Sequence, residues 1–283
     1  MAPEARAIIT IAGYELKKIL ARKRVLAIVA LIFLLEVSIY LISTLLPRSF
    51  IAPFIPVAWA VGLLAPAGLL LHILALTVGS ASFSEEYELG TADYWLTRPV
   101  STTEYFVGKV AGSAVFMTLI IALYSVLSLL LPWFIYGPQS KLEFYVLGAS
   151  SSILAMLTFL SIGIAMGEIL RRSMLATITS AAAFFASFIA EFYLNIVSRI
   201  NNDPSLIELS RLLPTWPSIR LVSSVVAEAL PGGLLLTSPA PIAGTIPAPE
   251  LGTAVASISM YAAIFLAMAH ARLSRTDVTR RAT

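Results

Sequence analysis

Apolar residues form long, nearly unbroken runs along this chain, and short polar segments separate the runs. A helix needs about 20 such residues to cross a hydrocarbon core of about 30 Å. Six runs reach that length, at residues 25–46, 57–83, 107–131, 146–170, 174–197 and 251–271. The pattern predicts an all-α polytopic membrane protein, with six transmembrane helices in a single transmembrane domain over residues 1–283.

The composition agrees with this interpretation. The chain is 58% hydrophobic and 12% charged, whereas a soluble domain is about 45–50% apolar and about 25% charged. So few polar residues do not cover a water-exposed globule of this size, which argues against a soluble enzyme. The sequence pI is near 9.2, but the net charge is only +3. We therefore expect no nucleic-acid partner. Cysteine is absent, which excludes disulfides and thiolate metal ligands.

The positions of the basic residues predict the orientation in the membrane. Most of the 19 lysines and arginines lie in alternate connecting segments, beginning with the N-terminal one. Segments rich in lysine and arginine stay in the cytoplasm. The pattern predicts a cell-membrane protein with both termini cytoplasmic.

The segment 4–24, before the first run, combines apolar residues at spacings of three and four with basic residues on other faces. This pattern is typical of an amphipathic helix that lies in the membrane interface. The basic residues that we expect to anchor it are Lys17, Lys18, Arg22, Lys23 and Arg24.

The predicted cytoplasmic loop 84–106 is acidic at its start, although basic residues dominate that side of the membrane elsewhere. Its acidic residues include Glu85, Glu86 and Glu88. Ser82 and Glu85 have the spacing of a capping box, and Gly90 favours a helix end. The pattern predicts a separate short helix in the first part of the loop.

The second part of the loop predicts a turn and a new helix. Arg98 and Pro99 favour the turn. Ser101 and Glu104 then form a second capping-box pattern, which predicts that a helix begins at Thr102. A connector with two helix-start signals is longer than a simple link between spans needs, and it indicates a docking surface.

The predicted outer segment 198–250 is long and partly apolar. Asp203, Pro204 and Ser205 predict the start of one short helix, and a second is expected over residues 218–230. We expect this segment to pack on the outer membrane face or to enter it as re-entrant helices.

Ionisable residues inside the predicted spans are candidate functional groups, because a charge is costly there. Glu36 and His72 fall at similar depths, so we expect them to meet near mid-membrane, either as part of a transport path or as a structural hydrogen bond. Glu168 precedes Arg171 and Arg172 by three and four residues, which predicts a local ion pair.

Two pairs of glycines have the Gly-x-x-x-Gly spacing that allows two helices to approach closely. They are Gly108 with Gly112 and Gly163 with Gly167. We assign both pairs to packing.

The order of residues in the loop resembles a known family. Glu88, Gly90-Thr91, Pro99-Val100-Ser101, Glu104 and Gly108-Lys109 resemble the loop between the second and third spans of ABC-2-type permeases, the membrane subunits of one class of ATP-binding-cassette exporters. The basic segment before the first span and the six-span layout are also similar. Thr97-Arg98 departs from the family pattern, which has small or apolar residues there.

The resemblance implies a non-catalytic permease subunit whose loop contacts a separate nucleotide-binding ATPase. ATP and Mg²⁺ would be bound by that partner, with no cofactor or metal on this chain, and a second permease chain would complete a homodimer or heterodimer. The transported substrate is not implied. The residues expected to couple to the ATPase are Glu85, Glu86, Glu88, Gly90, Thr91, Arg98, Pro99, Ser101, Glu104 and Lys109.

The chain has no phosphate-binding loop of its own. A phosphate loop needs Gly-x-x-x-x-Gly-Lys followed by Ser or Thr. At the single Gly-Lys pair, Gly108-Lys109, the first glycine is replaced by Thr103 and the final position is Val110. Two alternatives remain open: an ion-coupled secondary transporter that uses Glu36, and a membrane-embedded enzyme.

Overall fold

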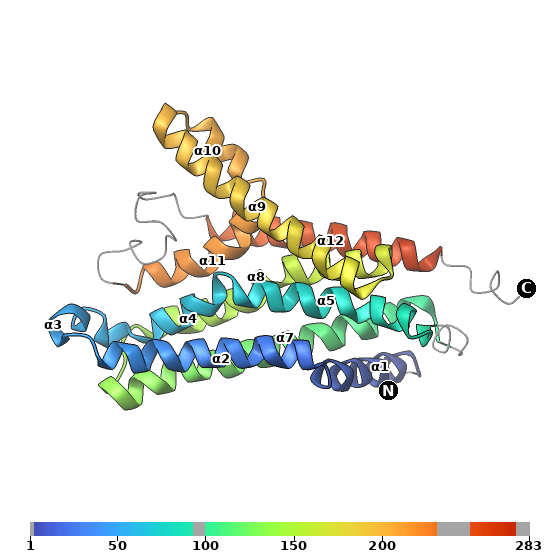
Figure 1. Cartoon of the computed structure of the whole chain (residues 1–283), viewed down its shortest axis with the longest axis horizontal. Helices are drawn as coiled ribbons and strands as arrows, with labels where there is room; N and C mark the ends of the chain where they lie inside the picture. Colours follow the sequence, from blue (N-terminus) through green and yellow to red (C-terminus); the bar gives the residue numbers. More distant parts are fainter. Residues whose placement is uncertain (1–2, 93–99, 231–249, 276–283) are drawn as a thin grey trace, which may run out of the picture.

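The protein is an elongated bundle of helices (Figure 1), as a computed structural model of residues 3–92, 100–230 and 250–275 shows. Within these residues there is no strand. The long helices are α1 (Pro3–Leu20), α2 (Lys23–Thr44), α5 (Leu70–Glu88), α7 (Thr102–Tyr136), α8 (Leu142–Leu170), α9 (Ser173–Asn201) and α12 (Leu251–Ser274). The shorter ones are α3 (Arg48–Ile51), η1 (Ile55–Val57), α4 (Trp59–Ala67), α10 (Ser205–Ser210) and α11 (Thr215–Ala227).

Five helices (α2, α7, α8, α9 and α12) are long and apolar enough to cross a membrane, and α4 and α5 together make a sixth candidate, bent by 42°. The predicted span over residues 57–83 therefore consists of two helices and a break. Pro66 has no N–H to donate to the carbonyl of Gly62, and Gly68 follows closely. Leu69 then has an irregular backbone conformation before α5 begins.

Helix α5 also extends further than expected. It continues through Glu85 and Glu86 to Glu88, so the acidic residues lie on its last turns. Ser82 is buried inside α5 and does not cap a helix. The predicted separate short helix is therefore wrong, whereas the predicted helix start at Thr102 is confirmed.

The first and the last described residues lie at the same end of the bundle (Figure 1). We call this the α1 end, and we call the opposite one the α3 end, where α3 joins α2 to η1. A chain that crosses the membrane an even number of times begins and ends on the same side, as the six apolar runs predict.

Helices α5 and α8 pack with their backbones in close approach. A Cβ atom at Gly79 would lie 2.4 Å from the carbonyl oxygen of Leu160, and one at Gly163 would lie 2.8 Å from that of Leu76. A Cβ atom at Gly167 would lie 2.4 Å from the carbonyl oxygen of Ser80. The predicted packing role of Gly163 and Gly167 is confirmed, and the partner is α5.

The segment after α9 contains two short helices. α9 extends away from the bundle and carries α10 near its far end (Figure 1). The predicted start of the first short helix is confirmed, since α10 begins at Ser205. The Asp203 Oδ1 accepts hydrogen bonds from the amide and the hydroxyl of Ser205 at 3.0 and 2.7 Å. α11 begins three residues before the expected range of 218–230 and ends three residues before the end of that range, and it packs on α8. Residues 231–249 lie outside the described residues.

Candidate functional site

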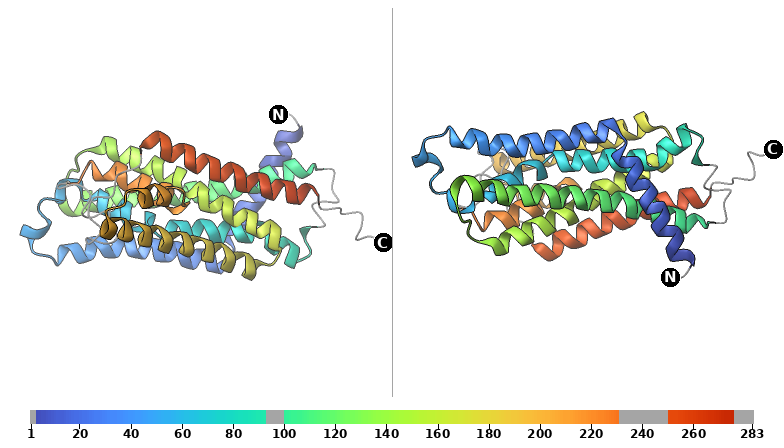
Figure 2. Two further views of the ribbon diagram at one scale, coloured as in Figure 1. Left: turned by 90° about the horizontal axis from the view of Figure 1, so that it is seen from above. Right: turned by 90° about the horizontal axis from the view of Figure 1, so that it is seen from below.

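Helix α1 lies obliquely across α7 at the α1 end (Figure 2). Two glycines of α7 make this contact possible. A Cβ atom at Gly108 would lie 2.7 Å from the Cβ of Ile11, and one at Gly112 would lie 2.7 Å from the carbonyl oxygen of Ala12. The predicted packing role of Gly108 and Gly112 is confirmed, with α1 as the partner.

A buried lysine connects α1, α5 and α7 at this crossing. The Lys109 side chain is 1% exposed, and its ammonium donates to Glu15 at 2.9 Å and to Glu86 at 2.7 Å. Both carboxylates are buried as well. Because an isolated charge is costly to bury, each of these groups depends on the other two.

Two further basic residues complete the cluster, Lys18 on α1 and Arg22 just before the start of α2. The Lys18 ammonium lies 3.1 Å from Glu86, and Arg22 lies 2.7 Å from Glu85 and 3.5 Å from Glu15. We call the six residues Glu15, Lys18, Arg22, Glu85, Glu86 and Lys109 the ion-pair network. Its three acidic and three basic residues balance in charge.

Burial affects the groups of the network unequally. It lowers the pKa of the Lys18 ammonium, and the nearby charge of Lys109 lowers it further, while Glu15 and Glu86 act in the opposite direction. Glu85 is the most accessible of the three acidic residues, with 26% of its side chain exposed. The cluster is therefore most hydrated at Glu85 and driest at Lys109.

Aromatic rings close the buried side of the ion-pair network. The Tyr105 hydroxyl donates to Glu86, and the Lys109 ammonium lies 5.1 and 5.4 Å from the ring centres of Phe83 and Tyr105. A cation near ring faces is stabilised by the ring quadrupole. The network is thus shielded from water on the side of α7.

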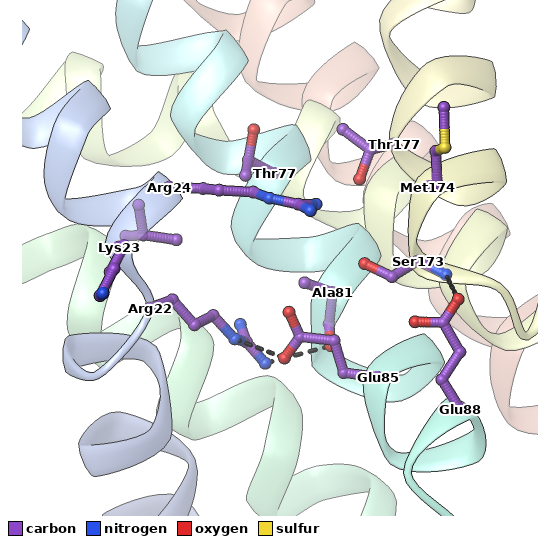
Figure 3. Close-up of a pocket in the computed structure, with 11 residues that line it drawn as sticks. Arg22, Lys23, Arg24, Thr77, Ala81, Glu85, Glu88, Ser173, Met174 and Thr177 are labelled. Carbon is purple, nitrogen blue, oxygen red and sulfur yellow. Dashed lines mark hydrogen bonds and ion pairs between the residues drawn. The ribbon is translucent and has the colours of Figure 1, made fainter.

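The end of α5 also contacts α8 and α9. Glu88 accepts a hydrogen bond from the amide of Ser173, the first residue of α9, at 2.9 Å (Figure 3). Tyr87 donates to Glu168 at 2.9 Å, and Glu168 pairs with Arg171 at 3.2 Å. The predicted local ion pair of Glu168 is confirmed, with Arg171 as the partner.

An exposed turn follows α5. Gly90 has φ +68°, a conformation that favours glycine, and it ends the helix as predicted. Leu89, a large apolar side chain, is 72% exposed there, and Glu88 and Thr91 are exposed beside it. We call residues 88–91 the α5 turn.

The start of α7 is capped locally. The Ser101 hydroxyl accepts from the Glu104 amide at 3.1 Å, and the Glu104 carboxylate accepts from the Ser101 amide at 2.7 Å. The predicted capping box is confirmed, and it occupies the carboxylate of Glu104. Arg98 and Pro99 lie outside the described residues.

The five basic residues predicted to anchor α1 have two different environments. Lys18 and Arg22 belong to the ion-pair network, whereas Lys17, Lys23 and Arg24 are exposed. Glu15 was missed in the sequence, although a signal for it exists. It lies four residues from both Ile11 and Ile19 on the buried stripe of α1, where an acidic residue needs a partner.

Glu36 and His72 do not form the predicted pair, since neither has a hydrogen-bond partner among the described residues. Glu36 faces Gly62 of α4 and lies beside Tyr40. His72 belongs to α5, beyond the bend, and packs on Phe159 and Phe184 with ring centres 5.2 and 5.8 Å away. The two side chains point to different neighbouring helices.

Comparison with known proteins identifies the family. The family model described as ABC-2 family transporter protein matches residues 9–278, from α1 to just beyond α12. A search of curated proteins gave no match. The predicted membership of the ABC-2-type permease family is therefore confirmed, over residues 9–278. Members of this family are non-catalytic, multi-pass membrane components. The chain belongs to the ABC-2 family of transporter proteins, as a permease component of an ABC transporter.

Proposed function

We propose that this chain is the permease subunit of an ABC exporter and that a separate ATPase docks on its α5 turn. The observation that carries the proposal is the exposed apolar side chain of Leu89. It directly follows α5, whose last turns are held by buried ion pairs. Burying this side chain against a partner would remove its apolar surface from water, which is favourable. In this proposal the α1 end is cytoplasmic.

The ion-pair network supports a mechanical role for this end of the protein. Glu86 on α5 is bonded to Lys109 on α7 and to Lys18 on α1. Displacement of the α5 turn would therefore move the three helices as one unit. The bond from Glu88 to the amide of Ser173 adds the start of α9.

The network also divides the acidic residues by role. Glu86 is buried, and its charge serves contacts within the chain. Glu88 is exposed and can meet a partner while it caps α9. Of the three acidic residues, we therefore propose that only Glu88 contacts the ATPase directly, together with Leu89, Gly90 and Thr91. Glu85 lies at the edge of this surface.

The remaining parts of the proposal follow from the family and the topology. ATP and Mg²⁺ are bound and used by the ATPase chain. Six spans form half of a transport path, so a second permease chain, identical or related, completes it. Export from the cytoplasmic side is the proposed direction, and the substrate is unidentified.

A matched pair of variants tests the docking surface. Leu89→Arg places a charge in the α5 turn, and Leu212→Arg does the same at a site of similar exposure, 69% against 72%, near α10. The tagged full-length chains are purified from their native membrane in a gentle detergent. We expect a stoichiometric ATPase to copurify with the wild-type chain and with Leu212→Arg, and to be lost from Leu89→Arg.

Two results would contradict the proposal at different points. An ATPase retained by monodisperse Leu89→Arg would place the docking surface elsewhere. Wild-type chain purified alone, in a detergent that preserves a known ABC transporter complex, would contradict the ATPase partner itself.

The membrane-enzyme alternative loses its main support. Such an enzyme would use the adjacent carboxylates of Glu85 and Glu86. Glu85 is engaged in an ion pair with Arg22, and Glu86 in ion pairs with Lys109 and Lys18. For the secondary transporter, the remaining support is Glu36, and family membership favours the permease.

A further inference from the structure

A cavity of about 480 Å³ opens at the α1 end, next to the ion-pair network. It lies between the junction of α1 and α2, the middle of α5 and the start of α9 (Figure 3). Its walls combine basic side chains with the hydroxyl-bearing residues Thr77 and Thr177 and the apolar Ala81 and Met174. No ligand is yet assigned to it.

The cavity contains two basic residues that the protein does not neutralise. Arg22, Lys23 and Arg24 all line it, but only Arg22 has an acidic partner, Glu85 at 2.7 Å. Lys23 and Arg24 form no ion pair with any residue in the described ranges. In Figure 3, the Arg24 guanidinium extends into the cavity between α2 and α9, toward Thr177.

The acidic residues in the cavity are already occupied. Glu85 is bound by Arg22, and Glu88 accepts from the amide of Ser173 at 2.9 Å. Three basic and two acidic side chains line the cavity, which leaves one excess positive charge. An anion that enters would meet the free fork of Arg24, a donor geometry suited to phosphate.

The surroundings of the cavity indicate that this anion has an apolar tail. Arg24 is the second residue of the apolar span α2, and Leu26 beside it is 44% exposed. On the opposite wall, Met174 is 69% exposed and Leu175 is 47% exposed. The basic residues thus lie at the level where two lipid-exposed helices begin.

We infer that this cavity binds the phosphate of an anionic phospholipid, with Arg24 as the principal ligand and Lys23 as a second cation. Basic pockets between transmembrane helices are suited to acidic lipid headgroups. The acyl chains would follow the apolar faces of α2 and α9. The lipid would then occupy the space between the start of α2, α5 and the start of α9, next to the ion-pair network.

Lipid binding to the purified full-length chain tests this inference. The probe is phosphatidylglycerol added to delipidated protein, and phosphatidylcholine is the neutral control. Retained lipid is counted by native mass spectrometry, and binding is titrated by the rise in unfolding temperature. We expect wild type to retain phosphatidylglycerol and to be stabilised by it, with little effect of phosphatidylcholine.

Variants locate the site. Arg24→Gln should weaken phosphatidylglycerol binding roughly fivefold, the effect expected for one basic residue near an anionic lipid. Arg24→Lys should recover most of the binding. Lys17→Gln is the matched control, since Lys17 is also basic and exposed but lies outside the cavity, and it should bind as wild type does.

Three outcomes would overturn the inference. Equal binding by wild type and Arg24→Gln would exclude Arg24 as a ligand. Equal losses in Arg24→Gln and Lys17→Gln would indicate general surface attraction. Full competition by inorganic phosphate would indicate a site for the free anion instead of a lipid. The isolated chain is used throughout, so these results do not depend on the ATPase, and Arg24→Gln should still copurify with it.

Discussion

Glu86 and Glu36 are the same side chain, equally removed from water, in two different surroundings. Glu86 is 2% exposed and contacts two lysines and a tyrosine at the α1 end. Glu36 is 0% exposed, and neither of its carboxylate oxygens has a hydrogen-bond partner among the described residues. One carboxylate holds three helices together, and the other is enclosed by α2 and α4.

The difference shows that burial alone does not indicate the role of an ionisable residue in a membrane protein. A buried carboxylate contributes to the fold through the charges that meet it. Without such charges, a buried carboxylate destabilises the fold, and its removal takes that cost away. Changes of single residues should therefore affect the two sites very differently.

The largest effect is expected from Lys109→Met, which makes Glu86 resemble Glu36. The change leaves Glu15 and Glu86 buried without the cation they share. Breaking a buried ion pair costs ~3–5 kcal/mol. Thermal unfolding in detergent should show a large fall in midpoint, and Lys17→Met, at an exposed site, should show little change. A wild-type midpoint for Lys109→Met would mean that the network does not hold α1 in place.

A smaller loss is expected from Glu86→Gln, which keeps the shape of the side chain and removes its charge. Hydrogen bonds to charged groups contribute about 2–3 kcal/mol, and the amide retains part of the contact with Lys109. The same unfolding measurement should rank this variant between Lys109→Met and wild type. A result equal to wild type would remove the contrast with Glu36.

Gly112→Ala tests the geometry of the network without changing any charge. The new Cβ atom would lie 2.7 Å from the carbonyl oxygen of Ala12 and 2.8 Å from the Cβ of Glu15. α1 has to move, at a cost of about 1–2 kcal/mol. Limited proteolysis near Lys17 and Arg22 should be faster than in wild type. Gly252→Ala, a position with open space around it, is the control and should be cut at the wild-type rate.

The smallest effect is expected from Glu36→Gln. No described group balances a charge at this position, so the neutral amide loses no ion pair. The unfolding free energy should change less than in Glu86→Gln, because no ion pair is broken. A loss as large as that of Glu86→Gln would show that the charge of Glu36 has a stabilising partner that the described residues do not include. Normal transport by this variant would also remove the support for an ion-coupled mechanism.

The sequence predicted the features that arise from neighbouring residues. The apolar runs identified the spans because the thickness of the hydrocarbon core sets their length. Ser101 and Glu104 identified the start of α7, since a capping box involves residues only three positions apart. The end of α5 was misjudged, because Glu85 and Glu86 read as loop residues until their partners on other helices are known.

Contacts between distant residues were not predictable in the same way. Equal depth suggested a contact between Glu36 and His72, but depth says nothing about which face of a helix a residue occupies. The bend after Pro66 also changes the direction of α5 relative to α4. Glu15 was overlooked because its partner Lys109 lies on another helix, far along the chain.

The separation of Glu15 from Lys109 bears on how the protein is made. The two residues are 94 positions apart, so α1 is synthesised long before the lysine that it needs. At ~5–20 residues per second, translation would take roughly 5 to 20 s to cover that interval. During that time α1 lacks its contacts with α7, and Glu15 would stay in water without its lysine partner. The arrival of α7 in the bilayer would then be the event that recruits α1, so a nascent chain halted before Lys109 should expose α1 to cellular quality control.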